Sequence, residues 1–398
     1  MTALTVPGSK QRIASIDILR GLVMVIMALD HVRDFFHYGH PAPMNLATTT
    51  PILFFTRWIT HFCAPTFVFL SGISAYQAGT RRSKNEFRAF LIKRGLWLII
   101  VELLLITLSI TADVGYHVFV LEVIWVIACG MILLGLMAGL SSKVIGITGA
   151  ILIAGHNLLD PQFFNAEVVN NGLLGNLFLT AKGNMHFFAP SRGFLVAYAI
   201  LPWAGIMMLG YGIGALYRSG YNAVKRRKTL FYLGLAALIT FVSLRFINIY
   251  GDPRPWLPQS KPVYNILSFL NITKQPPSLL FACITVGTAL IFLSFAENIK
   301  TRFAAILTTY GSVPLFYFVC HLYILRLGTI MMYFATGHSA KQIDDPNSFP
   351  LLFQPVDMGI NLGWVYMAWA ILVCALYFPC RLYSRYKRTH DQWWLSYL

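Results

Sequence analysis

The chain has 398 residues, of which 57% are hydrophobic and only 12% are charged. A soluble domain carries about 25% charged residues, so this composition excludes an ordinary soluble protein and indicates burial in lipid. The net charge of +16 does not indicate a nucleic-acid partner, because the basic residues stand in short clusters between apolar segments.

Ten apolar segments approach the length of about 20 residues that crosses a bilayer. The first begins near Ile13 and runs past any signal-peptide core, so we expect it to be retained. The ninth contains Gly311 and Pro314, which predict a kink or a break. The sequence predicts an all-α polytopic membrane protein with a single domain over residues 1–398. Its spans are 14–36, 52–79, 92–112, 117–139, 143–159, 193–217, 229–250, 277–297, 303–336 and 357–380.

The basic residues predict the orientation of these spans, because Lys and Arg are enriched in cytoplasmic loops. Of the 31 basic residues, 20 lie in one alternating set of segments: Lys10/Arg12, Arg81–Arg94, Lys143, Arg218–Lys228, Lys300/Arg302 and Arg381–Arg388. The opposite loops hold six: Lys182, Arg192, Arg254, Lys261, Lys274 and Lys341. Both termini are therefore expected in the cytoplasm. The loops 160–192, 251–276 and 337–356 are expected on the other side, as a lid or a substrate entrance.

The first span carries an unusual number of ionisable residues, which are costly in a membrane and are functional candidates by default. Asp17 and Arg20 are separated by three residues and can pair across one helical turn. His31 follows Arg20 by eleven residues, which is close to three turns, so both lie on nearly the same face roughly 16 Å apart. The alternative is an ion pair at the interface for Asp17 and Arg20, and a polar helix end for His31.

This pattern suits proton transfer in the outer half of the membrane. A neutral imidazole at His31 can take a proton from a hydroxyl or an amine that attacks an acyl carbon. A carboxylate of Asp30 or Asp34 is expected to fix its tautomer and to stabilise the imidazolium. Arg20, with Asp17 and Arg57, is the candidate group for the cofactor side.

Other polar residues in or near the spans are weaker candidates, because each also fits a structural role. Glu102 and Glu122 lie inside the third and fourth predicted spans, and either can pair with a buried cation. Secondary cavity candidates are Glu122, His321, His61 and His40. No metal is expected, since the spacing of His31, His37 and His40 is not a ligand pattern. The basic segments 81–94 and 218–228 are explained by the enrichment of Lys and Arg in cytoplasmic loops alone. The functional alternative is that they bind an anionic lipid or a cofactor phosphate.

Several motifs together resemble a known family. Ser15-Ile-Asp17-Ile-Leu-Arg20-Gly21, followed by an apolar run to Asp30-His31, resembles the opening helix of membrane acyltransferases. The segments Ala64-Pro65-Thr-Phe-Val-Phe-Leu-Ser-Gly72, Leu201-Pro202-Trp203-Ala-Gly205 and Gly311-Ser312 through Tyr317 to His321 match later motifs. The chain thus resembles the bacterial branch of the heparan-α-glucosaminide N-acetyltransferase catalytic-domain family, which is similar to the acyltransferase-3 family.

The resemblance implies transfer of an acyl group, expected to be the acetyl group of acetyl-CoA, from the cytoplasm to an acceptor on the far side. It also implies a His base in or just beyond the first span. The spacing from Arg-Gly to His in the acyltransferase-3 family matches His31. In the lysosomal enzymes of the glucosaminide N-acetyltransferase family the catalytic His comes later in the chain, and its position is nearest to His40. We expect the chain to lack the large luminal N-terminal domain of those enzymes. We favour His31, because it shares the face of Arg20 and has carboxylate neighbours.

The sequence is consistent with two functions. The first is an acyl-CoA-dependent O- or N-acyltransferase of the bacterial inner membrane, with a small-molecule or glycan acceptor, membrane lipid around it and a possible homodimer. The second is a transporter or flippase that uses the same polar interior, which the interrupted ninth span fits. A purely structural protein does not need so many ionisable groups within its spans.

Overall fold

The computed structural model describes residues 13–160, 163, 172–181, 183–343, 350–390, 392 and 395. Lys10, Arg12 and Lys182, which contributed to the predicted orientation, lie outside these residues. Within the described part the protein is all-α apart from one small sheet, as the sequence predicts.

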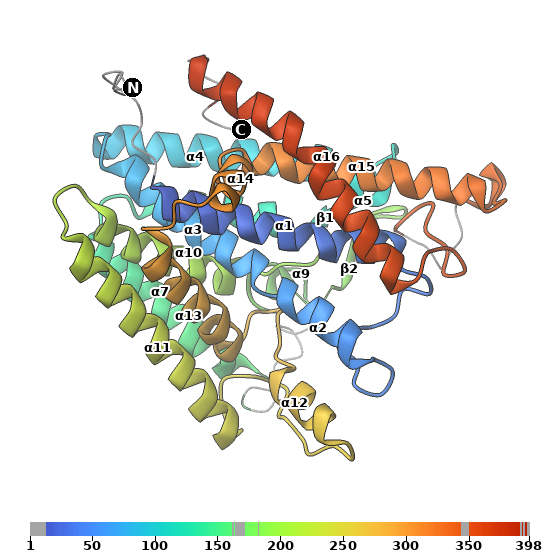
Figure 1. Cartoon of the computed structure of the whole chain (residues 1–398), viewed down its shortest axis with the longest axis horizontal. Coiled ribbons are helices and arrows are strands. Elements are labelled where there is room, and N and C mark those ends of the chain that lie inside the picture. Colours follow the sequence, from blue (N-terminus) through green and yellow to red (C-terminus); the bar gives the residue numbers. More distant parts are fainter. Residues whose placement is uncertain are drawn as a thin grey trace.

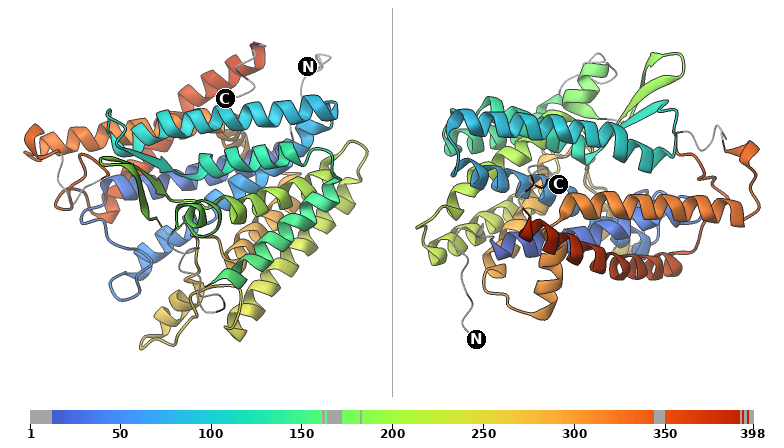
Figure 2. Two further views of the ribbon diagram at one scale, coloured as in Figure 1. Left: turned by 180° about the vertical axis from the view of Figure 1, so that it is seen from behind. Right: turned by 90° about the horizontal axis from the view of Figure 1, so that it is seen from above.

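Helix α1 (Ala14–Phe36) runs through the middle of the molecule (Figures 1 and 2). On one side it packs against α14 (Arg302–Gly311), α15 (Pro314–Ala335) and α16 (Leu362–Thr389), and on the other against α3 (Cys63–Gly79). The most charged span of the sequence is therefore enclosed by other helices, and most of its residues are buried.

A second group of helices packs below α1 in Figure 1. Helix α10 (Ile200–Gly214) lies between α3 and α7 (Ser142–His156), and α11 (Ala223–Ile247) pairs with α13 (Leu279–Ala296). Only a minority of the residues in the apolar stretches of α7, α11 and α16 are buried, whereas α10 and α13 are largely buried. The exposed helices thus present the apolar face that lipid requires.

Helix α4 (Lys84–Val101) packs against α6 (Val123–Leu136) and continues into a π-helical turn, η1 (Glu102–Ile106), and α5 (Thr107–Thr111). Ser83 caps its start, because its hydroxyl accepts from the N–H of Glu86 while the Glu86 carboxylate accepts from the N–H of Ser83. The π-helical turn widens the helix where Glu102 enters the interior.

A three-stranded sheet joins two loops at the far end of the helices. Strands β1 (Val118–Leu121) and β3 (Arg192–Val196) are parallel with Leu121 beside Val196, and β2 (Met185–Ala189) is antiparallel to β3. The remaining elements are short: α2 (Pro51–Thr60), η2 (Asn157–Leu159), α9 (Leu173–Gly175), η3 (Asn176–Thr180), η4 (Ala215–Tyr217), α12 (Pro262–Leu270) and η5 (Ala340–Gln342).

Seven helical segments in the described part have the length and hydropathy of membrane spans: Pro51–Gly79, Ser142–Leu159, Ile200–Tyr217, Ala223–Ile247, Leu279–Ala296, Pro314–Ala335 and Leu362–Thr389. The other three predicted spans correspond to helices as well. Helix α1 carries five charged residues, α4 begins among basic residues, and α6 has only 14 residues. The protein is therefore a polytopic membrane protein, and the count of ten spans stays a prediction.

Several predicted boundaries are shifted in the structure. Residues 118–121 and 192–196 are strands, so α6 begins at Val123 and α10 at Ile200 rather than near 117 and 193. A short apolar run is equally consistent with a buried strand and with a helix, which explains these errors. The last helix begins at Leu362 rather than at 357 and continues to Thr389, because its basic end remains helical beyond the apolar stretch.

Two predicted spans are interrupted helices. The ninth divides at Gly311 and Pro314 into α14 and α15, which confirms the expected break. The second divides at His61 and Phe62 into α2 and α3. Both interruptions flank α1, so they help to shape the interior around it.

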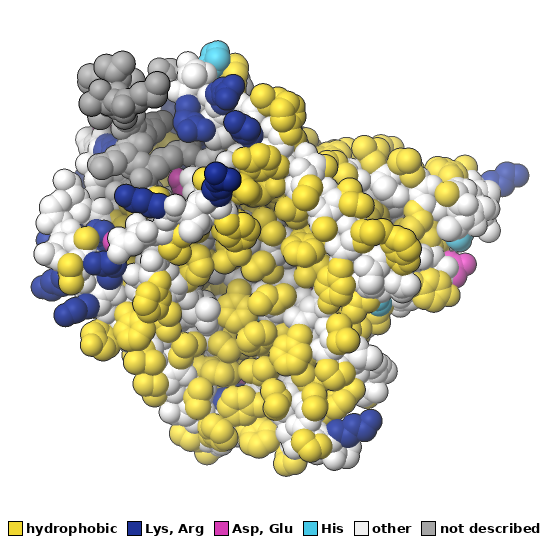
Figure 3. Space-filling view, viewed as in Figure 1, with side chains coloured by type: hydrophobic (Ala, Val, Ile, Leu, Met, Phe, Trp, Pro, Cys, Tyr) yellow, Lys and Arg dark blue, Asp and Glu magenta, His cyan; other side chains and the backbone are white. Residues whose placement is uncertain are grey.

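Basic side chains gather at one end of the molecule. Figure 3 shows Lys and Arg at the upper left, over the starts of α4 and α11 and the end of α16, beside a broad apolar surface. Such a distribution is what the predicted orientation requires.

Backbone-to-backbone contact fixes two helix pairs. A Cβ atom on Gly72 of α3 would lie 2.0 Å from the carbonyl oxygen of Met207 in α10, and one on Gly210 of α10 would lie 2.0 Å from that of Phe69 in α3. Gly21 and Gly311 form the same kind of contact between α1 and α14. Small residues allow such close approach between membrane helices.

We predict that Gly72→Ala destabilises the protein, because the added methyl group separates α3 from α10. The expected cost is about 1–3 kcal/mol, measured as a lower thermal unfolding temperature in detergent. Gly155→Ala in α7 is the matched control, since nothing lies within 4 Å of the added methyl group. The control should be as stable as the wild type or more so. Equal stability of Gly72→Ala and the wild type would contradict the prediction.

Candidate active site

A cavity of about 120 Å³ opens beside α1 in the centre of the helices. Side chains from α1, α3, α4, α6 and α15 form most of its wall. It is lined by Met27, Asp30, His31, Thr60, Cys63, Ala64, Phe67, Ser71, Arg94, Leu98, Glu122, Val123, Ile124, Ile127, Met131, Tyr198, Lys274, Pro314, Leu315 and Phe318. A mainly apolar wall with a few polar groups is typical of a small-molecule site.

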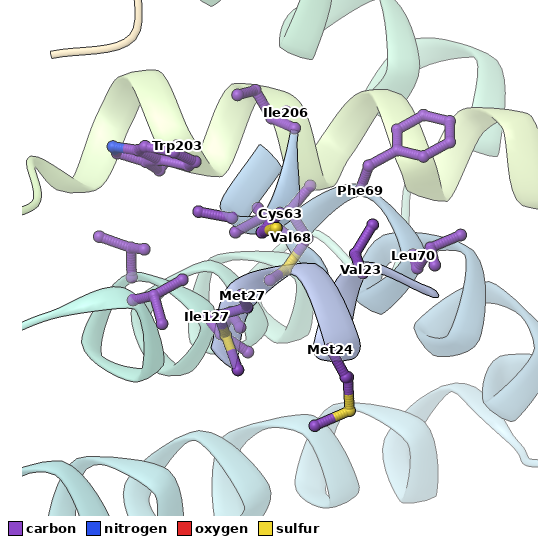
Figure 4. Close-up of a cluster of buried hydrophobic side chains, with 14 of the residues drawn as sticks. Val23, Met24, Met27, Cys63, Val68, Phe69, Leu70, Ile127, Trp203 and Ile206 are labelled. Atoms are coloured by element: carbon purple, nitrogen blue, oxygen red, sulfur yellow. The ribbon is translucent and has the colours of Figure 1, made fainter. Parts of the chain in front are cut away.

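The cavity is elongated along the helix axes. Its lining on α3 extends from Cys63 to Ser71, which corresponds to roughly 12 Å of helix. Arg94 lies at the end nearer the basic surface, and Lys274 lies in the loop at the opposite end. In Figure 4, Met27, Cys63 and Ile127 lie close together from three different helices, in the cluster that borders the cavity. The cavity thus extends from the side of the basic cluster toward the outer loops.

His31 on the cavity wall forms a close pair with His321. The Nδ1 atom of His31 lies 2.6 Å from Nε2 of His321, and the two rings stack with centroids 4.9 Å apart. The Nδ1 atom of His321 lies 3.0 Å from the carbonyl oxygen of Tyr317, one turn earlier in α15. His321 is fully buried, whereas His31 is only partly buried.

These contacts determine the tautomers of both rings. The carbonyl oxygen of Tyr317 only accepts, so Nδ1 of His321 carries a proton and donates it. In the neutral ring, Nε2 of His321 is then an acceptor, and Nδ1 of His31 must donate to it. The Nε2 atom of His31 therefore keeps its lone pair, as a general base requires.

The carboxylate of Asp30 is held by two guanidinium groups. Arg33 donates to one oxygen at 2.9 Å, and Arg57 of α2 binds the other oxygen. Arg33 also donates to Asp34 at 2.5 Å. The carboxylates expected to orient His31 are thus engaged with arginines, and the ring is oriented by His321 instead.

The sheet positions Glu122 and Tyr198 at the outer end of the cavity. These residues follow the paired strand ends Leu121 and Val196, and the N–H of Ala197 donates to the carbonyl of Leu121 at 3.2 Å. The backbone N–H of Glu122 donates to the buried carboxyl group of Glu102.

Lys274 reaches the cavity from a loop that is extensively hydrogen-bonded. Asp252 accepts from the N–H of Thr273 at 2.8 Å and from the hydroxyl of Ser278 at 2.7 Å. Arg245 of α11 donates to four carbonyl groups of the same loop, those of Arg254, Ser268, Phe269 and Asn271. The Nζ atom of Lys274 lies 5.7 Å from the ring centre of Tyr198. Burial and the nearby Arg57 lower the pKa of Lys274.

Several predicted site residues lie away from the cavity wall. Arg20 pairs with Asp17 at 2.8 Å, as expected, and also donates to Gly311 and Ser74 at 3.0 Å, which ties α1 to α14 and α3. His61 is buried against Phe281. The cavity lining also does not include Asp34, Arg57, His40 or His321. Arg57 and His321 nevertheless contact Asp30 and His31, which line the cavity.

Sequence reasoning did not single out Lys274, Tyr198 or Arg94 as individual site residues. Both residues entered the sequence analysis only through the predicted orientation, Arg94 as one member of a basic cluster and Lys274 as a basic residue of an outer loop. The run Lys274-Gln-Pro-Pro-Ser278 offers a weak signal, because two prolines restrict the backbone next to the lysine.

The fold and the cavity define a class. The protein is a polytopic membrane protein with a pair of imidazole groups beside an elongated internal cavity, an arrangement suited to group transfer within the membrane.

The chain matches the family described as heparan-alpha-glucosaminide N-acetyltransferase, catalytic, over residues 12–251, which is more than half of its length, and it belongs to that family. The family is one of transmembrane acetyltransferases, which use acetyl-CoA as the donor. A search among curated proteins gives no match. The matched range includes His31, Glu122 and Tyr198, whereas Lys274 and His321 lie beyond it.

We predict that Asp30→Asn lowers stability strongly, since it leaves Arg33 and Arg57 without the carboxylate that joins them. Removing one partner of a buried ion pair costs about 3–5 kcal/mol, and the loss should appear as a lower unfolding temperature. Asp34→Asn is the matched control, because 52% of that side chain is exposed and its effect should stay below about 1 kcal/mol. Similar losses for both variants would show that Asp30 has no special structural role.

Proposed function

We propose that the protein is an acyl-CoA-dependent acyltransferase, with His31 as the general base. It transfers an acetyl group from cytoplasmic acetyl-CoA to a hydroxyl or amine group of an extracytoplasmic sugar or related acceptor. The bacterial inner membrane is its proposed location. The observation that carries the proposal is the free Nε2 lone pair of His31 on a cavity that extends from Arg94 to Lys274.

The proposed step needs one proton acceptor and no covalent enzyme intermediate. Nε2 of His31 takes the proton of the acceptor hydroxyl or amine as its oxygen or nitrogen attacks the thioester carbonyl carbon. The tetrahedral intermediate then collapses, the carbon–sulfur bond breaks, and the imidazolium returns the proton to the thiolate of CoA. The products are the acetylated acceptor and free CoA, with His31 neutral again.

The two ends of the cavity suit the two substrates. Arg94 and the basic surface beside it lie where a nucleotide phosphate would approach, and guanidinium groups bind phosphate well. The apolar wall between Arg94 and His31, including Leu98, Ile127 and Phe318, suits an uncharged thioester arm. Glu122, Tyr198 and Lys274 are left for the acceptor.

One observation favours a transporter as a second candidate. The interruption between α14 and α15 lies beside the cavity, and interrupted helices frame the substrate sites of many transporters. Family membership favours the transferase. Titration with acetyl-CoA separates the two, since only the transferase should be stabilised by this ligand.

We predict that His31→Gln lowers kcat by about 10²–10⁴-fold, because the variant loses the base for the acceptor proton. The measurement is transfer of labelled acetyl from acetyl-CoA by the purified protein, with thermal stabilisation by CoA as the test that the donor site is intact. His40→Gln is the matched control and should keep wild-type turnover. Wild-type activity of His31→Gln, or loss only in His40→Gln, would overturn the assignment of the base.

We also predict that His321→Leu lowers kcat by at least about 10²-fold, because a wrong tautomer disables a base whose ring stays in place. The KM for acetyl-CoA should change little. His321→Gln places an amide oxygen where it can accept from Nδ1 of His31, so it should recover part of the rate. If leucine and glutamine variants were equally impaired, the tautomer argument would lose its support.

A further inference from the structure

Lys274 differs from Arg33 and Arg57, the two cations that contact Asp30. Arg33 and Arg57 are neutralised by Asp30 and Asp34. Lys274 has neither a hydrogen bond nor an ion pair in the part of the chain that the structure describes, and its ammonium group faces the cavity beside Tyr198.

Glu122 does not neutralise this charge directly. It lines the same cavity, yet no ion pair joins Glu122 to Lys274 among the described residues. The two groups are held on separate supports, Glu122 by the sheet and Lys274 by the loop that Asp252 and Arg245 order. Rigid supports that keep opposite charges apart leave the ammonium group available to a ligand.

The energetics favour an anionic ligand at this position. A partly buried ammonium group without a hydrogen bond or an ion pair is unfavourable, and a carboxylate or phosphate would offset that cost through a charge-assisted hydrogen bond. Burial and Arg57 lower the pKa of Lys274, so an anion that binds would also favour the protonated form. The loop of Lys274 lies at the end of the cavity opposite Arg94, which is the acceptor end.

We propose that Lys274 forms an anion subsite for the acceptor, so that the preferred acceptor carries a carboxylate or a phosphate near the group that is acetylated. This inference rests on the proposed function for the identity of the ligand as an acceptor. The subsite itself needs only the geometry of Lys274, and it distinguishes an acidic or phosphorylated sugar from a neutral one.

The test compares sugars that differ in one anionic group. The purified full-length protein is titrated with glucosamine 6-phosphate against glucosamine, and with glucuronate against glucose, and the unfolding temperature is recorded. We expect both anionic sugars to bind at least tenfold more tightly than their neutral or cationic counterparts. The two pairs show whether a phosphate or a carboxylate is preferred.

Three variants locate the effect. Lys274→Met should abolish the preference for the anionic sugars, and Lys274→Arg should retain it. Lys261→Met removes the same charge from an exposed position in the same outer loop, and it should behave as the wild type. No preference in the wild type, or a preference that survives in Lys274→Met, would overturn the subsite.

A parallel titration with CoA separates this proposal from the proposed function. CoA should stabilise the wild type and Lys274→Met equally, because its phosphates bind at the opposite end. If CoA did not bind to the wild type, the result would argue against the proposed acyltransferase function itself. Normal CoA binding without recognition of anionic sugars would remove only the anion subsite.

Discussion

The structure depends on the placement of charged groups inside an apolar solvent. A charge within a bilayer must face other protein or a cavity and must find a partner. Helix α1 carries five such groups, and its position between α3, α15 and α16 gives all of them except the exposed Asp34 protein surroundings. Arg33 and Arg57 join Asp30 from two helices, while Arg20 joins α1 to α14 and α3. The charges that make α1 a poor lipid-facing helix therefore make it a suitable central one.

Close helix packing supports the same arrangement. Gly21 and Gly311 bring α1 and α14 into backbone contact, and the chain then breaks before α15 begins at Pro314. Because α15 starts at this point, His321 comes to lie beside His31, although 290 residues separate them in the sequence. A break that removes helix hydrogen bonds is tolerated in a membrane where it is buried in protein. The interruption thus serves to position a side chain.

Local patterns predicted much of this fold, because hydrophobic length and charge spacing are local properties. The interruption at Gly311 and Pro314, the pairing of Asp17 with Arg20 and most helices follow from short stretches of sequence. The strands at 118–121 and 192–196 were missed, since parallel pairing between distant segments leaves little local trace. The cost of an ionisable group in a span marked His31, but its partner could not be inferred locally. Lys274 was missed for a similar reason, because only the Asp252 and Arg245 contacts direct that loop to the cavity.

The choice of partner for His31 has a physical consequence. A carboxylate partner would place a full negative charge beside the base before the reaction, and a charge in an apolar interior is costly. His321 orients the ring while it is itself neutral, through a chain that ends at a backbone carbonyl. The nearest carboxylate, Asp30, is held by two arginines instead of by the imidazole. Tautomer and charge are therefore controlled by different groups: His321 fixes where the proton lies, and the Asp30 cluster sets the electrostatic surroundings in which a second proton is received.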